Sequence, residues 1–233
     1  MIELKNVSKS FGKNLVLDDI SLTIQDGESV GLVGSNGCGK TTLVELLIGQ
    51  IKPDKGSITL NGSKDTYKKI GVQFQEGYWP PGITGKNIIS YFVKKKNMNT
   101  EDFEQLKNVF NLEGIINKSL SSLSAGQRQR INTLLAVANN QDYICLDEMI
   151  TGLDLEMQLR LIKYFKSKID EGKTMVIISH SPEEIETLCS TIIILKDSKI
   201  FYKNKKSAVV SEFGSVRNMM LKFYDKELKS NVK

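Results

Sequence analysis

Short apolar runs alternate with helical periodicities through the second half of the chain. Helical patterns over 127–138, 155–170 and 182–188 are followed in turn by short apolar runs over 143–146, 175–178 and 191–195. Apolar runs of this length are typical of parallel strands that are covered on both faces. The pattern therefore predicts an α/β fold with a mostly parallel sheet.

The first sixty residues carry a different pattern, in which strand signals dominate. Apolar residues alternate with polar ones over 20–24, as in a half-buried strand. Asp-Gly at 26–27 and Asn-Gly at 61–62 are tight-turn signals. Between them, an apolar strand over 29–33 leads through a glycine-rich loop into a helical pattern over 42–48.

Residues 84–118 lose the strand alternation, and we predict a mostly helical insertion there. Its apolar residues at helical spacings are Ile88, Ile89, Tyr91, Phe92, Phe103, Leu106, Val109 and Phe110. The lysine-rich end after Lys203 predicts a surface appendage. Its apolar residues favour a packed C-terminal helix over the alternative of an amphipathic helix near a membrane.

Composition limits the class of protein. With 233 residues, 40% hydrophobic and 25% charged, the chain resembles ordinary soluble domains. It shows no apolar run near the roughly 20 residues of a bilayer span and no signal-peptide pattern, so we expect it to stay in the cytoplasm. The net charge of +5 is spread along the chain, and no nucleic-acid partner is expected. Three scattered cysteines predict neither a disulfide framework nor a zinc site.

A phosphate-binding loop follows the strand at 29–33. The pattern G-x-x-x-x-G-K-[ST] is matched in every position by Gly34-Ser35-Asn36-Gly37-Cys38-Gly39-Lys40-Thr41. Glycines let backbone N–H groups curl around phosphate oxygens, and the following helix adds positive potential. Lys40 would hold the β- and γ-phosphates, and Thr41 would ligate Mg²⁺. We therefore predict binding of a nucleoside triphosphate.

Two carboxylates end the apolar run at 143–146. Ligands of parallel sheets bind beyond the carboxyl ends of the strands, which places Asp147 near the phosphates and Mg²⁺. Glu148 would orient or deprotonate an attacking water. Alone, such a pair of carboxylates is more often a solvated strand end. The phosphate loop upstream in the sequence favours the interpretation that the pair acts on the nucleotide.

The sequence Leu-Ser-Ala-Gly-Gln at 123–127 narrows the class of nucleotide-binding protein, because a phosphate loop also occurs in kinases, GTPases and helicases. Together with the phosphate loop and the acidic pair, it resembles the signature motif of ATP-binding cassettes of ABC transporters, over roughly residues 1–202. The resemblance implies one cassette domain over 1–233. It would have a P-loop NTPase core with a mostly parallel sheet, an N-terminal antiparallel β subdomain, a helical subdomain at about 76–128 and a surface tail at about 204–233.

The resemblance also implies roles for single residues. Glu148, His180 and Gln75 would be catalytic, with His180 as the switch histidine, and Thr41, Gln75 and Asp147 would hold Mg²⁺. The expected ATP-binding residues are Phe11, Gly34, Ser35, Asn36, Gly37, Cys38, Gly39, Lys40, Thr41, Thr42, Ser124, Ala125, Gly126, Gln127 and Asp154. Phe11 would stack on the adenine.

The signature implies a dimer, because one chain cannot place it on its own phosphate loop. Two cassettes would stack head-to-tail, as a homodimer or as a heterodimer with a second cassette. Ser124 and Gln127 also suit a helix capping box, and both interpretations can hold together. Ala125 stands where glycine is commoner, which costs about 1 kcal/mol if φ is positive there. Met149 replaces the usual proline.

Transport would need a separate membrane-spanning permease subunit, with this chain at the cytoplasmic face of the membrane. Trp79, within 77–81, would lie where such a subunit docks, or would pack within the helical insertion. The run over 70–75 looks slightly more like exporter ATPases. A soluble ATPase with an assembly role, such as in iron–sulfur cluster assembly, stays open as the alternative.

Overall fold

The computed structural model describes residues 1–66, 69–73, 80–98 and 100–230. Within them, a central sheet has the strand order β5-β6-β7-β3-β8-β9. Only the β8–β9 pair is antiparallel among its neighbouring strands. The strands are β3 (Ser29–Val33), β5 (Ile70–Val72), β6 (Tyr143–Asp147), β7 (Thr174–Ile178), β8 (Thr191–Lys196) and β9 (Lys199–Lys205). The predicted α/β fold with a mostly parallel sheet is confirmed.

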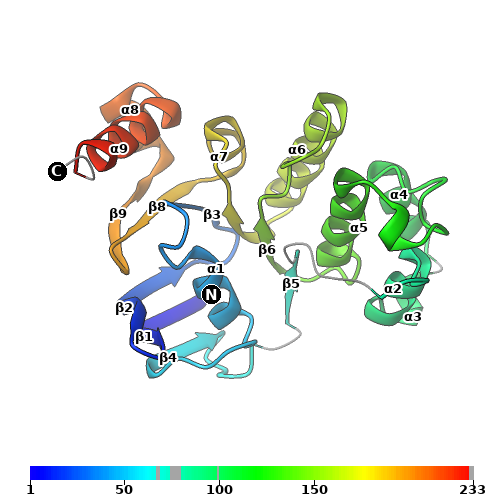
Figure 1. Ribbon diagram of the computed structural model, residues 1–233, viewed down its shortest axis with the longest axis horizontal. Coiled ribbons are helices and arrows are strands. Elements are labelled where there is room, and N and C mark those ends of the chain that lie inside the picture. Colours follow the sequence, from blue (N-terminus) through cyan, green and yellow to red (C-terminus); the bar gives the residue numbers. More distant parts are fainter. Residues whose placement is uncertain (67–68, 74–79, 99, 231–233) are drawn as a thin grey trace.

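A second, antiparallel sheet is built from the N-terminal part of the chain. Its strands, in the order β2-β1-β4, are β1 (Ile2–Phe11), β2 (Asn14–Ile24) and β4 (Lys55–Leu60). After β4, Asn61 and Gly62 have φ values of 50° and 77°, as the Asn-Gly hairpin signal predicts. Figure 1 shows this sheet in blue and cyan below the central one. The expected antiparallel β subdomain is thus present.

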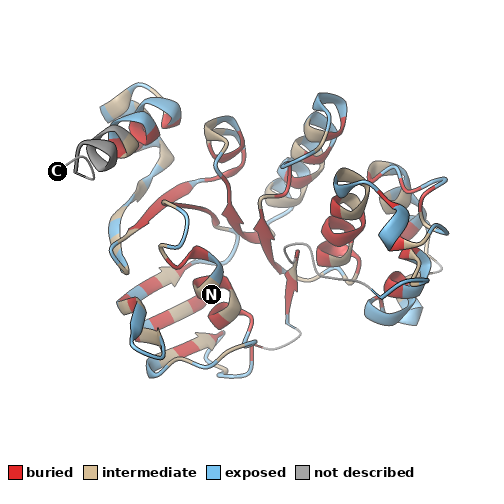
Figure 2. Cartoon of the chain, in the orientation of Figure 1, coloured by how far each residue is buried: buried red, intermediate tan, exposed pale blue. Residues whose placement is uncertain are grey.

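The central sheet separates two hydrophobic cores, because alternate residues of its strands face opposite sides. Leu32 and Val176 join the core that contains α1 and the N-terminal sheet. Val33 and Ile177 join the core that contains α5, α6 and α7. Figure 2 shows the central strands as buried. These helices are α1 (Lys40–Leu47), α5 (Ala125–Val137), α6 (Leu155–Asp170) and α7 (Pro182–Leu188).

The predicted helical insertion lies at one end of the molecule, beside α5 (Figure 1). Thr84 and Thr100 cap α2 and α4 by accepting the N–H groups of Asn87 and Phe103. The elements are α2 (Gly85–Phe92), α3 (Lys95–Met98), α4 (Glu101–Val109) and a 3₁₀ turn, η1 (Leu120–Ser122).

The C-terminal segment forms the packed C-terminal helix that its apolar residues favour, within the tail expected over about 204–233. It forms α8 (Lys206–Phe213) and α9 (Val216–Ser230), and α9 packs against α7. Arg217 pairs with Glu183 of α7. The apolar side chains are spaced to face inward, so the segment adds to a core. Its buried residues include Val209, Val216, Met219, Met220 and Phe223.

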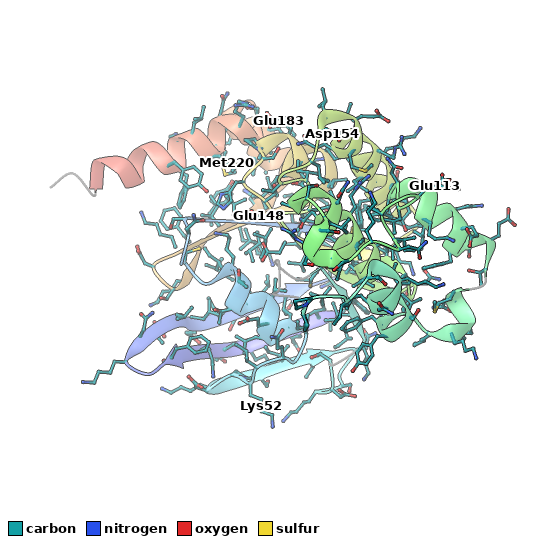
Figure 3. All side chains as sticks on the ribbon, turned by 45° about the vertical axis from the view of Figure 1, so that its right-hand side comes forward. Lys52, Glu113, Glu148, Asp154, Glu183 and Met220 are labelled. Carbon is teal, nitrogen blue, oxygen red and sulfur yellow. The ribbon has the colours of Figure 1, made fainter. Side chains whose placement is uncertain are left out.

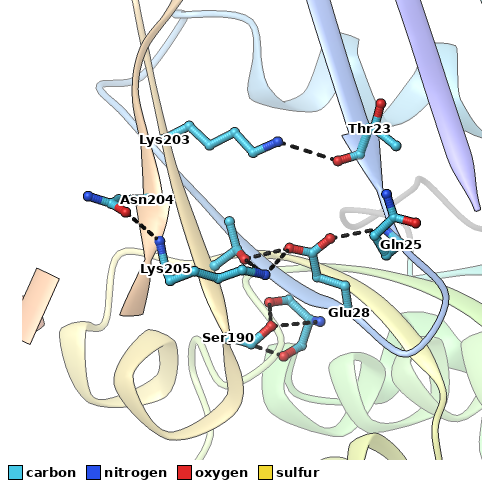
Figure 4. A network of polar contacts seen from close by, with 9 residues as sticks. Thr23, Gln25, Glu28, Ser190, Lys203, Asn204 and Lys205 are labelled. Atoms are coloured by element: carbon cyan, nitrogen blue, oxygen red, sulfur yellow. Dashed lines mark hydrogen bonds and ion pairs between the residues drawn. The ribbon is translucent and has the colours of Figure 1, made fainter. Parts of the chain in front are cut away.

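A partly buried carboxylate ties the start of β3 to the edge of the central sheet. Glu28 accepts hydrogen bonds from the Thr191 hydroxyl (2.5 Å), the Gln25 N–H (2.9 Å) and the Lys205 ammonium (3.0 Å) (Figure 4). Burial opposes ionisation, but these donors outweigh it and hold the pKa of Glu28 below its usual value. The Lys203 ammonium reaches the carbonyl of Thr23 in β2. These contacts hold the two sheets together at the start of β3, the end of the strand opposite the loop that follows it.

Candidate functional site

The loop between β3 and α1 wraps around the side chain of Lys40. Gly37 and Gly39 have φ values of 79° and 104°, which side-chain-bearing residues rarely adopt. Lys40 is 8% exposed, and its Nζ donates to the carbonyl oxygens of Gly34 (2.8 Å) and Ser35 (2.9 Å). A buried ammonium therefore lies at the N-terminus of α1, an arrangement that suits a phosphate group.

Asp147 ends β6 beside the first turn of α1. The Thr41 hydroxyl donates to Oδ2 of Asp147 at 3.4 Å. Burial raises the pKa of Asp147 to about 6, and the charge of Glu148 adds to the rise, while Thr41 and Lys40 oppose it. A low-dielectric site disfavours the free carboxylate, so a cation at this position would favour its ionised form.

Thr41 and Asp147 together present the oxygen donors that Mg²⁺ prefers. The described residues contain no group of three or more His, Cys, Asp or Glu that could hold a metal ion by themselves. Mg²⁺ in nucleotide sites is held by one or two protein groups together with phosphate oxygens and water. A hydroxyl in contact with a carboxylate fits this mode of binding.

Glu148 has a strained backbone that long-range contacts hold in place. Its φ is 53°, which costs a non-glycine residue on the order of 1 kcal/mol. Its N–H donates to the carbonyl of Ile178 (2.9 Å), and its carbonyl accepts from Nε2 of Gln129 (2.9 Å). In Figure 3, Glu148 lies between the N-terminal sheet below and the helices above.

His180 follows β7 and meets Glu148. Its Nε2 lies 3.6 Å from Oε1 of Glu148, and the two side chains are 41% and 33% exposed. Both groups can therefore reach a ligand at this edge of the sheet.

A pocket of about 470 Å³ lies at this edge. Its lining residues are Phe11, Val16, Asn36, Gly37, Gly39, Lys40, Thr41, Thr42, Asp147, Glu148 and Ile178. Phe11 is half exposed, so its ring is accessible to a planar ligand. Gly34, Ser35 and Cys38 belong to the same loop without lining the pocket. The structure thus brings together most of the ATP-binding residues that the sequence predicted in this half of the site.

The predicted signature lies outside this pocket. Ser124 caps α5 by accepting the N–H of Gln127 (3.2 Å), while Oε1 of Gln127 accepts the N–H of Ser124 (3.1 Å). The predicted capping box is therefore present. Ala125 begins α5 without a positive φ, so the cost considered for alanine does not arise. Ser124 and Ala125 are exposed, and no residue of 123–127 is among the described residues that line the pocket.

The signature lies against the loop that contains Asp154. A Cβ on Gly126 would come within 2.7 Å of the Gly152 carbonyl oxygen, so this close approach requires glycine. Asp154 itself caps α6 by accepting the N–H of Met157 (2.9 Å). Gln75 and Trp79 fall outside the described residues.

A buried amide network behind the acidic pair was not predicted. Gln73 donates through Nε2 to the Asp147 carbonyl (2.9 Å), as Gln129 does to that of Glu148. The Thr133 hydroxyl lies 3.1 Å from Oε1 of Gln73 and 2.8 Å from the Gln129 carbonyl. Polar residues on the sheet-facing side of α5 are the sequence signal that could have revealed this network.

Contacts with the phosphate loop also come from the C-terminal helix. The Tyr224 hydroxyl lies 3.4 Å from the Gly34 carbonyl oxygen, which also accepts from Lys40. No local pattern in the sequence indicates that these two residues, 190 positions apart, come into contact.

The glycine loop, the buried lysine and the strand-end aspartate define a phosphate-loop nucleoside triphosphatase fold. The family model described as ABC transporter matches residues 17–151. The chain belongs to this family and is an ATP-binding cassette of the ABC transporter type.

Similar proteins include cassettes named for both directions of transport. The petrobactin import ATP-binding protein YclP of Bacillus subtilis (strain 168) is 34% identical, over 86% of this chain and 85% of its own length. Nod factor export ATP-binding protein I of Burkholderia lata is 31% identical, over 91% of this chain and 74% of its own. The dimeric cassette MJ0796, solved with ADP and Pi, is 27% identical with a TM-score of 0.77, over 88% of this chain and 98% of its own.

Proposed function

We propose that this chain binds and hydrolyses ATP to drive transport through a membrane-spanning permease subunit. One observation carries the proposal: a single pocket brings Lys40, Thr41, Asp147 and Glu148 together at the carboxyl edge of the sheet. This is where an open α/β sheet binds its ligand. The pocket offers a cation for phosphates, oxygen donors for a metal and a carboxylate for water.

In this proposal each residue of the pocket has a role. Lys40 and the loop N–H groups hold the phosphates, and Phe11 stacks on the adenine. Thr41 and Asp147 hold Mg²⁺, with Gln75 as a further ligand expected from the sequence; Mg²⁺ supplies positive charge to the phosphate oxygens. Glu148 orients the attacking water and takes its proton, and His180 contacts the γ-phosphate.

The other half of each site would come from a second copy of the chain. The exposed N-terminus of α5 offers the Ser124 hydroxyl and positive helix potential for a γ-phosphate. No residue of 123–127 is among the described lining residues of the chain's own pocket, and this supports a head-to-tail homodimer. The cassette MJ0796 is reported as a dimer with ADP and Pi.

We further propose that the partner subunit spans the membrane and that this chain acts at its cytoplasmic face. Two relatives are named as ATP-binding proteins of an import and an export system. Export is the direction we propose, because the run over 70–75 looks slightly more like exporter ATPases; the importer relative is 34% identical and the exporter relative 31%. No helix in the described part of the chain is long and apolar enough to cross a bilayer.

Phosphate release from ATP by the purified chain, with and without Mg²⁺, tests the activity. We expect Mg²⁺-dependent turnover that Lys40→Ala abolishes. Turnover that is the same in wild type and Lys40→Ala would refute the assignment. Isolation of the native complex tests the partner: a polytopic membrane protein supports transport, whereas soluble assembly proteins would support the alternative.

A further inference from the structure

Glu184 is a buried carboxyl to which the proposed mechanism gives no role. It lies in the first turn of α7 and is 0% exposed. Gly31 of β3 allows α7 to approach the sheet closely, because a Cβ there would lie 3.0 Å from both Cys189 Sγ and Ile185 Cδ1. The carboxyl is thus sealed from water at the end of the sheet that carries the pocket.

The two residues that flank His180 are both tied to Glu184. The Ser179 hydroxyl donates to Oε2 of Glu184 at 2.5 Å. Oγ of Ser179 accepts the N–H of Ser181 at 3.0 Å, and Oγ of Ser181 accepts the N–H of Glu184 at 3.2 Å. The backbone turn that carries the imidazole is therefore closed by a ring of hydrogen bonds, in which the Glu184 carboxyl supplies the contact to Ser179 and the Glu184 N–H the contact to Ser181.

Holding a carboxyl in this place destabilises the fold. Oε1 of Glu184 is buried and has no hydrogen-bond partner among the described residues. Burial raises the pKa of Glu184 to about 7; Ser179 opposes the rise, and the charge of Glu148 adds to it. An apolar side chain facing the core would avoid this desolvation. The ordered turn at His180 is the structural feature that the carboxyl provides.

We propose that Glu184 is a positioning residue for His180. Through Ser179 it orders the turn from which the imidazole reaches Glu148, 3.6 Å away. The effect of this positioning on hydrolysis rests on the proposed function, in which the ordered imidazole contacts the γ-phosphate. Glu184 itself touches neither substrate nor metal in this role.

Nuclear magnetic resonance tests the positioning directly, because His180 is the sole histidine of the chain. Its imidazole C–H signals can be followed in the full-length protein without nucleotide. We expect Glu184→Ala and Ser179→Ala to shift or broaden these signals in the same way. Glu184→Gln should leave them near their wild-type positions, because an amide oxygen still accepts from Ser179. Glu212→Gln is the control, because this exposed carboxylate on α8 lies outside the turn.

Steady-state hydrolysis separates positioning from loss of fold. We expect Glu184→Ala and Ser179→Ala to lower kcat by roughly 10- to 100-fold while KM for ATP stays within about threefold. The double variant should lose little more than either single one, because both remove the same contact. Melting curves show which variants are folded. If Glu184→Ala does not fold, the comparison of Ser179→Ala with Glu184→Gln tests the proposal.

The two proposals fail in different ways. Wild-type protein that binds but does not hydrolyse ATP would refute the proposed function, while the imidazole signals would still decide the role of Glu184. Imidazole signals that are unchanged in folded Ser179→Ala or Glu184→Ala would overturn the positioning role, even in an active enzyme.

Discussion

Nε2 of His180 lies 3.6 Å from Oε1 of Glu148, although 32 positions separate the two residues in the sequence. They follow β7 and β6, which are neighbouring parallel strands with Asp147 and Ile178 as register partners. The Glu148 N–H also donates to the Ile178 carbonyl. The sheet therefore aligns a carboxylate and an imidazole at the edge where the phosphate loop lies.

Replacement of Glu148 by glutamine should separate binding from hydrolysis. The amide keeps the size of the side chain but cannot take a proton from water. We expect nucleotide affinity close to wild type and a loss of turnover of about 10²- to 10⁴-fold. Calorimetry and phosphate release measure the two quantities. With ATP bound, this variant should also accumulate as a dimer in size-exclusion chromatography.

Unchanged hydrolysis in Glu148→Gln would remove Glu148 from this role. A folded variant that stays monomeric with saturating ATP would instead contradict the shared-site dimer. Asp142→Asn is a matched control, since this exposed carboxylate lies just before the same strand.

Mixing two inactive variants should restore activity if the sites are shared between chains. Lys40→Ala damages the pocket, and Ser124→Ala damages the signature. A mixed dimer has one site with both halves intact, so an equal mixture should recover up to about a quarter of wild-type turnover. Phosphate release on mixing, with dimer composition from native mass spectrometry, measures this.

The control mixes Lys40→Ala with Glu148→Gln. Both residues line one pocket, so each site of a mixed dimer keeps a defect and no activity should return. Mixed dimers of Lys40→Ala and Ser124→Ala that stay inactive would refute the shared site.

Much of the architecture follows from local pattern. The apolar runs predicted the central strands because both faces of the sheet are buried, and eight consecutive residues predicted the phosphate loop. The apolar spacing of the C-terminal segment favoured a packed helix, but the surface on which this helix packs could not be predicted from local pattern. Met219, Met220 and Phe223 are spaced to face α7, and the partner surface exists only once the chain is folded.

The hydrogen bonds that hold Asp147 and Glu148 in place could not be predicted from local pattern. The left-handed backbone conformation occurs at Glu148 and not at a glycine, so the sequence does not indicate it. It depends on contacts from Ile178 and Gln129. Gln73 and Thr133 are 60 positions apart, and only the packing of α5 on the sheet brings them within 3.1 Å. Sequence patterns report periodicity, whereas these contacts depend on how the elements pack together.

Without metal and nucleotide, Asp147→Asn should stabilise the protein in a pH-dependent way. The pKa of Asp147 is raised to about 6, so the folded state binds its proton more tightly than the unfolded state. The contribution of the Asp147 carboxyl to the free energy of unfolding is fully present below about pH 4 and is lost as the pH rises through about 6. The asparagine variant avoids that loss, and we expect a gain of about 1 to 2 kcal/mol at pH 8 that disappears near pH 4.

Thermal melts between pH 4 and pH 8 in a chelating buffer measure the difference. Asp142→Asn, at an exposed position, should show no comparable rise with pH. A constant difference between wild type and Asp147→Asn over this range would contradict the pKa assignment. With Mg²⁺ and ATP, the order should reverse, because asparagine carries no charge for the metal.

Gln129→Leu tests whether the signature helix holds Glu148 in place. Leucine has a similar size but cannot donate to the carbonyls of Glu148 and Met149, which accept from Nε2 at 2.9 and 3.4 Å. Among the described residues, the Glu148 carbonyl would keep its contact with the Thr151 N–H. Losing this donor should cost about 1 to 3 kcal/mol of stability.

The kinetic consequence distinguishes support of Glu148 from general stability. Glu148 is held in a left-handed backbone, so the loss of Gln129 should lower kcat by roughly tenfold or more at temperatures where the variant is fully folded. ATP affinity should change little, because Lys40 and the loop glycines are untouched. Gln105→Leu, an exposed change of the same type on α4, should leave kcat at the wild-type value. A Gln129→Leu enzyme with lower melting temperature but wild-type kcat would show that α5 stabilises the strand end without orienting the carboxylate.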